Sequence, residues 1–529
     1  MKRHHVTLPL IAVILILAGG LMWWRYTVDD TYISLRYAEN LTLGNGPVFN
    51  PGERTEGYSC PLWVFLLGFL HWIGCDSLLA AKAIGLFSAL GLVALLYFSL
   101  QRQQCDPLIA GGAAVWLAIL PGLHVYGCSG METVPFAFAI ATMVTLPILC
   151  PSATARAWLL PASLLTVATL RPEGPLLFAA ISALWWFKAD SKQVRWGIAI
   201  AGIVLLSLFL LRYHYYGRFL PNTYLAKPSP LMYALTTEPL GMAVIQRLYV
   251  SAYIHPFEAL RSAGGVSIIF SGILALLFRK VDLGLLTAAV ATIIGGVVVG
   301  YTPEDWMPEN RFALPFLFPP LLLAALGVDA VRRLLSVEDF RKIRMALLLV
   351  LMLWSVFNVG VIAGLWMEYR NGDINTALNA ETYVAIGKWL QEHSRENDQV
   401  LAYEIGAVGY FSKRNVVDHE GLITTEVAKI IHTAGGYSQV RESGSDVAMR
   451  EIVRYCVAQK PEWFLVRSNS PLSLALGQPI PKEVANEAIQ QALVEELGPS
   501  MVLRQVFLMR PRHATSADKY LLLQRQGTQ

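Results

Sequence analysis

The stretch TLPLIAVILILAGGLMWW (residues 7–24) leads shortly into DDTYISLRYAEN (residues 29–40), and the junction between them decides the fold. The first stretch is about long enough to cross a bilayer as a helix. Two adjacent carboxylates, Asp29 and Asp30, stand where the chain should leave the lipid. Ionisable side chains at a membrane boundary are costly and usually serve a function. We therefore expect chemistry at a lipid–water interface.

The composition of the chain extends this expectation to most of its length. Of the 529 residues, 55% are hydrophobic and only 15% are charged, whereas soluble domains carry about 25% charged residues. We predict a polytopic α-helical membrane protein with about eleven transmembrane helices. The predicted spans are 7–24, 78–100, 107–124, 132–150, 156–170, 174–188, 196–213, 263–278, 282–300, 312–331 and 345–366.

The segment 61–74 is apolar but short for a spanning helix, so we expect it to lie at the membrane interface. If it does not span, the basic loops from Lys2 and Arg3 through Arg279 to Arg344 all fall on the cytoplasmic side, as the positive-inside rule requires. The N-terminus is then cytoplasmic, and the loops rich in acidic residues, Pro and Gly lie on the opposite side.

Two domains are expected from the change in composition near residue 370. Residues 1–369 form the transmembrane domain, with a first outer loop at 25–77 that carries interfacial helices. Residues 370–529 read as a soluble, non-cytoplasmic α/β domain, of ordinary size for one domain. Its predicted elements are a helix over 376–393 and strands at 399–403, 415–417, 462–466 and 520–523.

The acidic pair has two interpretations. Asp29 or Asp30 can cap a helix that begins near Thr31, where a carboxylate satisfies free backbone N–H groups. Alternatively, one aspartate acts as a general base toward an acceptor hydroxyl while the other orients that acceptor or a metal ion. Capping explains one aspartate and leaves the second without a role, so we favour the catalytic interpretation.

Other charged residues of the outer loops carry similar alternatives. Glu56, in NPGERTEGYS (residues 50–59), is a solvated loop charge or a binding residue. Glu132 faces a helix dipole or lines a site. Arg171 and Glu173 form an ion pair in a tight turn, or Arg171 binds a lipid phosphate. Arg311 either snorkels to the headgroups or binds phosphate through its planar fork.

Several catalytic motifs are missing from the sequence. It contains no G-x-x-x-x-G-K-[ST] phosphate loop, no H-E-x-x-H zinc helix and no G-x-S-x-G nucleophile elbow. An enzyme that works on the outer side of the membrane needs an activated donor already delivered there. A group linked to a lipid phosphate meets that need.

The motifs, taken together, resemble those of a known family. DDTYISLRYA (29–38) and GMET (130–133) occur in order with RPEG (171–174), NTYLAK (222–227), DWMPENRF (305–312), EIGAVGYF (404–411) and VDHEGL (417–422). This pattern is similar to the GT-C fold of polyprenyl-phosphate-dependent glycosyltransferases. Within that fold it looks most like the terminal β-arabinofuranosyltransferases and the related flagellar motor control proteins. Glu304 and Glu404 depart from that pattern, where Gly and Asp are expected.

The resemblance implies an inverting transfer of a monosaccharide, with arabinofuranose as one candidate, from polyprenyl phosphate to an envelope glycan, lipid or protein. It implies a bacterial cytoplasmic (inner) membrane location, membrane lipids as partners and no nucleic acid; a divalent cation stays open. Asp29 would be the base and Asp30 its helper. The phosphate ligands would be Arg171, Lys227 and Arg311, and the sugar or acceptor ligands Glu56, Glu132, Glu173, Asp305 and Glu404.

The rival class is a non-enzymatic membrane protein of the envelope, either a scaffold or a transporter. A transporter should carry charges or Gly/Pro breaks near the middle of several helices, and inverted repeats. Here the polar clusters gather on one face, which argues against transport. A scaffold does not need the acidic pair, so the substitution Asp29→Asn separates it from an enzyme.

Overall fold

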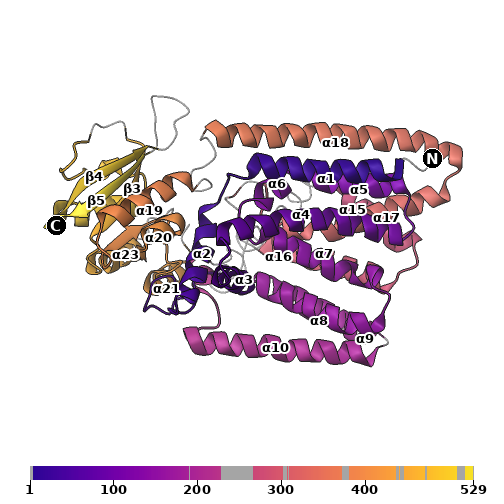
Figure 1. The fold of residues 1–529 in the computed structure, drawn as a ribbon, viewed down its shortest axis with the longest axis horizontal. Coiled ribbons are helices and arrows are strands. Elements are labelled where there is room, and N and C mark those ends of the chain that lie inside the picture. The colour runs from indigo at the N-terminus through magenta and orange to yellow at the C-terminus, as the bar shows by residue number, and fades with distance from the viewer. Residues whose placement is uncertain are drawn as a thin grey trace.

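The computed structural model describes residues 4–189, 191–227, 266–301, 307, 309–371, 380–436, 440, 446–470, 474–508 and 519–527. Figure 1 shows a long bundle of helices with an α/β part at one end. The N-terminus lies at the end of the bundle far from the α/β part, and the C-terminus lies within that part.

The bundle follows the predicted spans closely, because each predicted range overlaps a helix in the described part of the chain. These helices are α1 (His4–Trp23), α4 (Ser77–Arg102), α5 (Pro107–Ala118), α6 (Pro121–Gly127), α7 (Thr133–Leu149), α8 (Ala153–Leu170), α9 (Gly174–Lys188), α10 (Lys192–Tyr216), α15 (Val266–Phe278), α16 (Leu283–Tyr301), α17 (Phe318–Leu334) and α18 (Val337–Asn371). The range 107–124 divides into α5 and α6, which meet at a bend of 56°.

The membrane character of the bundle is clear from helix length and composition. Six described helices are long and apolar enough to cross a membrane, or seven if α5 and α6 count as one bent span. Four more apolar helices are shorter, among them α7 and α9. The protein is a multi-pass membrane protein, and the number of eleven crossings stays a prediction.

Local capping explains where several helices begin. Asp76 accepts a hydrogen bond of 2.7 Å from the Leu79 N–H at the start of α4. Asp106 accepts one of 2.9 Å from the Leu108 N–H, next to a proline in the first position of α5. Each cap satisfies one of the N–H groups that a helix start leaves free.

The first outer loop folds into two helices, α2 (Asp29–Thr42) and α3 (Pro61–Trp72), which pack against each other. The segment 61–74 thus contains a short helix, Pro61–Trp72, and its position at the membrane interface stays a prediction. Between the two helices, the side-chain amide of Asn50 donates to the Val416 carbonyl and accepts from the Val416 N–H, at 2.9 Å each. This side chain pairs with the strand edge at residue 416 as a neighbouring strand would.

The α/β part contains one five-stranded mixed sheet. Its strand order is β2-β1-β3-β5-β4, with β1 parallel to β2 and β3, and β5 antiparallel to β3 and β4. The strands are β1 (Gln399–Ala402), β2 (Asn415–Asp418), β3 (Trp463–Ser468), β4 (Met501–Leu508) and β5 (Lys519–Arg525). Four of them match predicted strands, whereas β4 was not predicted.

Helices surround this sheet. They are α19 (Glu381–His393), α20 (Gly406–Ser412), α21 (Thr425–Thr433), α23 (Asp446–Ala458) and α24 (Ala488–Leu497), with short 3-10 turns η4 (Lys482–Val484) and η5 (Gly498–Ser500). The helix predicted over 376–393 begins at Glu381 among the described residues, and 376–379 lie outside them. Two further short elements belong to the membrane part, α11 (Asn222–Ala226) and η2 (Leu314–Phe316).

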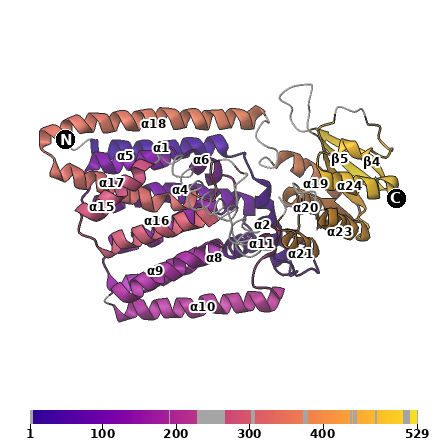
Figure 2. The ribbon, with the colours of Figure 1, turned by 180° about the vertical axis from the view of Figure 1, so that it is seen from behind.

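The two parts share one continuous hydrophobic core. It runs from the bundle through α2 to one face of the sheet, where it includes Tyr383 and Trp463. At the junction, the Tyr32 ring lies 5.5 Å from the ring of Tyr410 and 5.2 Å from that of Phe411. Helix α20 packs directly on α2, and α11 packs beside α21 (Figure 2). The α/β part is therefore docked on the first outer loop.

Candidate active site

Asp29 is the point at which the two parts of the molecule meet. Its Oδ2 accepts a hydrogen bond of 2.9 Å from the Gly406 N–H, and its Oδ1 accepts one of 2.8 Å from the Ala407 N–H. The side chain is only 3% exposed. Ile405 and the rest of the α20 start supply no side-chain cap of their own. Asp29 therefore caps a helix that lies almost four hundred residues later in the chain.

Gly406 makes this contact possible. A Cβ atom at position 406 would lie 2.1 Å from the Asp29 carbonyl oxygen and 2.6 Å from its Oδ2. No side chain fits at such a distance from backbone. The glycine thus lets the start of α20 reach the carboxylate.

The capping alternative for the acidic pair, a cap on a helix that begins near Thr31, is wrong in its detail. Helix α2 begins at Asp29 itself rather than near Thr31, and its N-cap residue is Val28, which makes no side-chain cap. Neither aspartate caps α2, because both lie inside its first turn. The capping function exists, but it is directed across the interface to α20.

The surroundings of Asp29 tune its acidity. Burial raises the pKa of the carboxyl from 3.8 to about 7, and the charge of Asp30 adds to the rise. The two N–H donors from Ala407 and Gly406 act in the opposite direction, because they favour the charged form. A carboxylate with a pKa near neutrality is suited to take up a proton at physiological pH.

Asp30 lies beside Arg311. The Arg311 Nη1 atom is 3.4 Å from the Asp30 Oδ2 atom; the aspartate side chain is 36% exposed and the arginine side chain 9%. The guanidinium of Arg311 also lies 4.6 Å from the centre of the Phe312 ring. Glu309 and Asn310 just before it take left-handed backbone conformations, with φ of 61° and 49°. This tight turn brings the guanidinium to the aspartate.

A second ion cluster joins Glu132, Arg171 and Glu173. Arg171 donates from Nη1 to Glu132 Oε1 at 2.7 Å. It donates from Nε and Nη2 to the two Glu173 oxygens at 3.2 and 3.0 Å. All three residues are buried. The ion pair between Arg171 and Glu173, one of the two expected alternatives, is present, and Glu132 joins it from the start of α7.

The α/β part contributes two further acidic side chains. Burial raises the pKa of Glu404 well above its usual range, and the charges of Asp29, Glu420 and Asp30 raise it further. Burial likewise raises the pKa of Glu420 to about 8, although the Lys227 charge lowers it. These mutual effects place Glu404 and Glu420 within electrostatic reach of the aspartate pair.

Lys227 and Glu56 lie at the edge of this arrangement. Lys227 is exposed and follows α11, and its charge also lowers the pKa of Asp418. Glu56 is buried, and its Oε2 accepts a hydrogen bond of 2.7 Å from the Arg212 Nε of α10. Asp305 lies outside the described residues.

The residues Gly406, Ala407 and Glu420 were not predicted as part of the site. Each belongs to a stretch that carries the family resemblance, EIGAVGYF or VDHEGL. The sequence thus contained these residues within recognisable family motifs, but the motifs do not predict which residues touch Asp29 or Asp30. Within the described part of the chain, no group of three or more His, Cys, Asp or Glu side chains is placed to hold a metal ion.

Parts of the chain match known proteins in sequence. Residues 372–518 match a family described as a domain of unknown function (DUF8728). The terminal beta-(1->2)-arabinofuranosyltransferase of Mycobacterium tuberculosis is 31% identical over 249 residues, which is 43% of this chain and 39% of that protein. The enzyme of the same name from Corynebacterium glutamicum is 25% identical over 451 residues, 74% of this chain and 63% of that protein. The chain therefore spans less than two thirds of either relative.

A solved structure extends the likeness to the fold. ArnT from Cupriavidus metallidurans, in the apo state, matches 98% of this chain and 97% of its own with a TM-score of 0.53 and 12% identity. The chain has the GT-C fold, as predicted from its motifs, with a small mixed sheet in the C-terminal region. The resemblance to the terminal arabinofuranosyltransferases is likewise confirmed.

Proposed function

We propose that this protein is an inverting glycosyltransferase that moves a monosaccharide, with arabinofuranose as the first candidate, from polyprenyl phosphate to a hydroxyl group. The relatives from Mycobacterium tuberculosis and Corynebacterium glutamicum are named as arabinofuranosyltransferases. The ArnT structure is also known with bound undecaprenyl phosphate, at a TM-score of 0.50 and 11% identity to this chain. Both observations support a lipid-phosphate donor and a sugar as the transferred group.

The observation that carries the proposal is the state of Asp29. Its carboxyl is buried, fixed by two backbone N–H donors and has a pKa raised to about 7. Those two hydrogen bonds use about half of the acceptor positions of a carboxylate, so the group can still accept a proton. The cap on α20 alone would serve a scaffold as well, but it needs no proton uptake near neutral pH, and the raised pKa of Asp29 is what favours a base.

The proposed reaction is a single displacement at the anomeric carbon of the donor sugar. Asp29 takes the proton of the acceptor hydroxyl as its oxygen bonds to the anomeric carbon from the face opposite the phosphate. The bond between the anomeric carbon and the phosphate oxygen breaks, and its electron pair stays on the phosphate. Because a phosphate leaves readily, one carboxylate base suffices and the configuration inverts.

Arg311 is the strongest candidate for holding the donor phosphate. Its guanidinium is almost buried, and its contact with the partly exposed Asp30 spans 3.4 Å. A phosphate that displaces this long contact gains a bidentate partner, and its developing charge is stabilised in the transition state. Lys227 and Arg171 remain proposed phosphate ligands. The cluster of Arg171 with two glutamates carries a net negative charge, which favours Arg311 over it.

The other predicted residues are proposed to bind the sugar or the acceptor. Glu132, Glu173 and Glu404 would accept hydrogen bonds from sugar hydroxyls, and the same role is proposed for Glu56 and Asp305. The acceptor is an envelope glycan, lipid or protein. We place the protein in the bacterial inner membrane with a cytoplasmic N-terminus and with the site and the α/β part on the outer side, because the basic loops lie on the opposite side.

The direct test is a transfer assay with purified protein. A panel of radiolabelled polyprenyl-phosphate sugars, arabinofuranose among them, is incubated with an envelope glycan fraction, with and without a chelator. The wild-type protein should transfer one sugar, and Asp29→Asn should lose the transfer. A rate that falls with the chelator would reveal a required divalent cation.

A matched control is Asp76→Asn. Asp76 is an exposed cap at the start of α4, and asparagine caps a helix as well as aspartate does. This variant should transfer at the wild-type rate. Two results would favour the scaffold or transporter alternative over the enzyme. One is wild-type protein that binds polyprenyl phosphate but reacts with no donor, and the other is Asp29→Asn with the wild-type rate.

A further inference from the structure

An apolar cavity lies in the end of the bundle that is far from the α/β part. Its volume is about 220 Å³, and helices α5, α15, α17 and α18 line it. Apart from Ser271 and the indole N–H of Trp116, the lining residues carry no polar side-chain group. Leu108 and Trp116 both line it, and the eight helical steps that separate them correspond to a rise of ~12 Å. The shape suits a section of a hydrocarbon chain.

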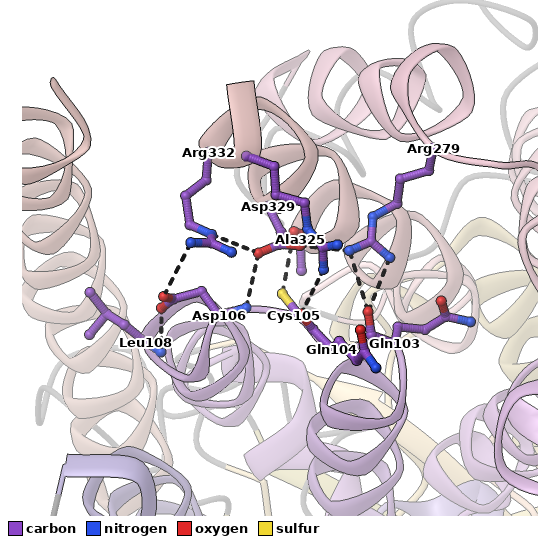
Figure 3. Close-up of polar contacts among 10 residues, drawn as sticks. Gln103, Gln104, Cys105, Asp106, Leu108, Arg279, Ala325, Asp329 and Arg332 are labelled. Atoms are coloured by element: carbon purple, nitrogen blue, oxygen red, sulfur yellow. Dashed lines mark hydrogen bonds and ion pairs between the residues drawn. The ribbon is translucent and has the colours of Figure 1, made fainter. Parts of the chain in front are cut away.

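One guanidinium stands at the polar end of this cavity. On α17, Ala324 and Val328 line the cavity, and Arg332 follows Val328 by four residues, so it extends the same face of the helix. On α5, the Leu108 N–H donates to Asp106 Oδ1, and the other oxygen of Asp106 lies 4.0 Å from Arg332 Nη1. Figure 3 shows Arg332 above Asp106 and Leu108.

The cluster around Arg332 has a surplus of positive charge. The carboxylate of the fully buried Asp329 accepts from Arg332 Nε at 3.0 Å, Arg333 Nε at 2.8 Å and Arg279 Nη2 at 2.6 Å. It also accepts from the Asp106 N–H at 2.9 Å. The ion pairs of this cluster therefore join three arginines to two aspartates.

The surplus charge is accessible at Arg332. Its side chain is 30% exposed. Its Nε and Nη1 atoms face Asp329 and Asp106, and Nη2 has no hydrogen-bond or ion-pair partner among the described residues. Nη2 can thus donate to an oxygen anion without the loss of the contact that holds Asp329.

We propose that this cavity is a binding site for an anionic phospholipid. One acyl chain enters between α5, α17 and α18, and the phosphate binds Arg332. The rest of the chain lies along the outer face of α18, where Leu349, Leu353 and Phe357 are exposed. A soluble phosphate would leave the apolar cavity unmatched, and a neutral lipid would leave the surplus charge without a partner. The site is independent of the transfer reaction proposed above and lies at the other end of the bundle.

The test measures the first lipid bound to the purified protein by native mass spectrometry. Phosphatidylglycerol and phosphatidylcholine with the same acyl chains are titrated separately. Phosphatidylglycerol should bind about fivefold more tightly, since one basic residue near an anionic headgroup contributes about that factor. Arg332→Gln should remove the preference, whereas Arg156→Gln, a basic residue of α8 outside the cluster, should keep it.

A second variant tests the cavity without touching the charges. A Cβ at Gly112 would meet only Leu351, at 3.5 Å, so Gly112→Leu is tolerated by the backbone and places its side chain in the cavity. It should weaken the binding of both lipids at least fivefold. This variant also serves if Arg332→Gln fails to fold, as thermal unfolding would reveal.

Four outcomes overturn the proposal. The first is equal binding of the two lipids by the wild type, and the second is a preference that persists in Arg332→Gln. The third is competition by soluble glycerol phosphate, and the fourth is tighter binding of undecaprenyl phosphate than of phosphatidylglycerol. Glycerol phosphate would identify a site for a soluble anion, and undecaprenyl phosphate a second site for the donor lipid.

Discussion

The two ends of the bundle hold their buried aspartates in opposite ways. At the α/β end, Asp29 is buried with two backbone N–H groups and with Asp30, another carboxylate, beside it. At the far end, Asp329 is buried with three arginines around it. The arginines around Asp329 stabilise its charged form, so this carboxylate contributes to structure. Asp29 has only neutral N–H donors and a neighbouring carboxylate, so its charged form is less stable and it takes up a proton more readily. The contrast separates the part of the molecule that holds the fold from the part proposed to do chemistry.

The largest effect on stability is expected at the far end. Asp329→Asn leaves three arginines without their shared anion, and breaking a buried ion pair costs about 3–5 kcal/mol. Unfolding in mixed micelles should show this loss. The control is Asp282→Asn, an exposed cap at the start of α16, because asparagine caps equally well. A loss below 1 kcal/mol for Asp329→Asn would remove the contrast between the two ends.

The next effect is expected at the junction. Gly406→Ala places a Cβ against the Asp29 carbonyl, so α20 and the carboxylate must move apart. A displacement of about 1 Å at a reacting group lowers the rate about 10²-fold. The turnover number of sugar transfer should fall accordingly, while the binding of polyprenyl phosphate stays near the wild-type value.

The matched glycine for that experiment is Gly202 in α10. A Cβ at this position would have nothing within 4 Å, and alanine is a better helix former than glycine. Gly202→Ala should therefore keep full activity. Equal rates for the two glycine variants would show that α20 does not position Asp29.

The pH dependence follows from the pKa of Asp29. Because that pKa is raised to about 7, the base form disappears below pH 7, and the rate should fall about tenfold for each further unit of pH. The folded state binds this proton more tightly than the unfolded chain, so the carboxyl lowers stability as the pH rises from about 4 to about 7. Asp29→Asn should remove that part of the pH dependence of unfolding. Wild-type rates that stay constant from pH 5 to pH 7 would contradict the assignment.

The smallest effect is expected from Asp30→Asn. The charge of Asp30 raises the pKa of Asp29, so its removal should move the midpoint of the pH–rate profile to lower pH. Its ion pair with Arg311 is long and partly exposed, and such pairs contribute less than about 1 kcal/mol. The pH–rate profile of purified Asp30→Asn checks the first statement, and its free energy of unfolding checks the second. A midpoint that moves upward would reverse the sign of the interaction.

Much of the fold could be predicted because its signals are local. The eleven apolar ranges each overlap a helix, and four of the five strands were found from short apolar runs. The missed strand, β4, has a register shift between Leu503 and Gln505 against β5. Such an irregularity breaks the alternation of buried and exposed side chains from which a strand is recognised.

The site was predictable in its members but not in its contacts. The pairing of Arg171 with Glu173 follows from their proximity in sequence, whereas Glu132 joins them through the packing of α7 on α8. The contact between Asp29 and the start of α20 depends on the docking of the α/β part. No periodicity or spacing within the sequence encodes a contact between segments so far apart. The family resemblance included both the segment around Asp29 and the segment around Gly406, but it did not predict that they are in contact.

The central claim is that Asp29, held by the α/β part, is the base of the transfer reaction. The most direct test is the rate of sugar transfer by wild-type protein and by Asp29→Asn, measured from pH 5 to pH 9 at saturating donor. The claim predicts a wild-type profile that rises with pH, breaks near pH 7 and levels off above it, and a variant that is slower by about 10² to 10⁴-fold with no break near that pH. A variant that keeps the wild-type rate, or the same break near pH 7, would contradict it.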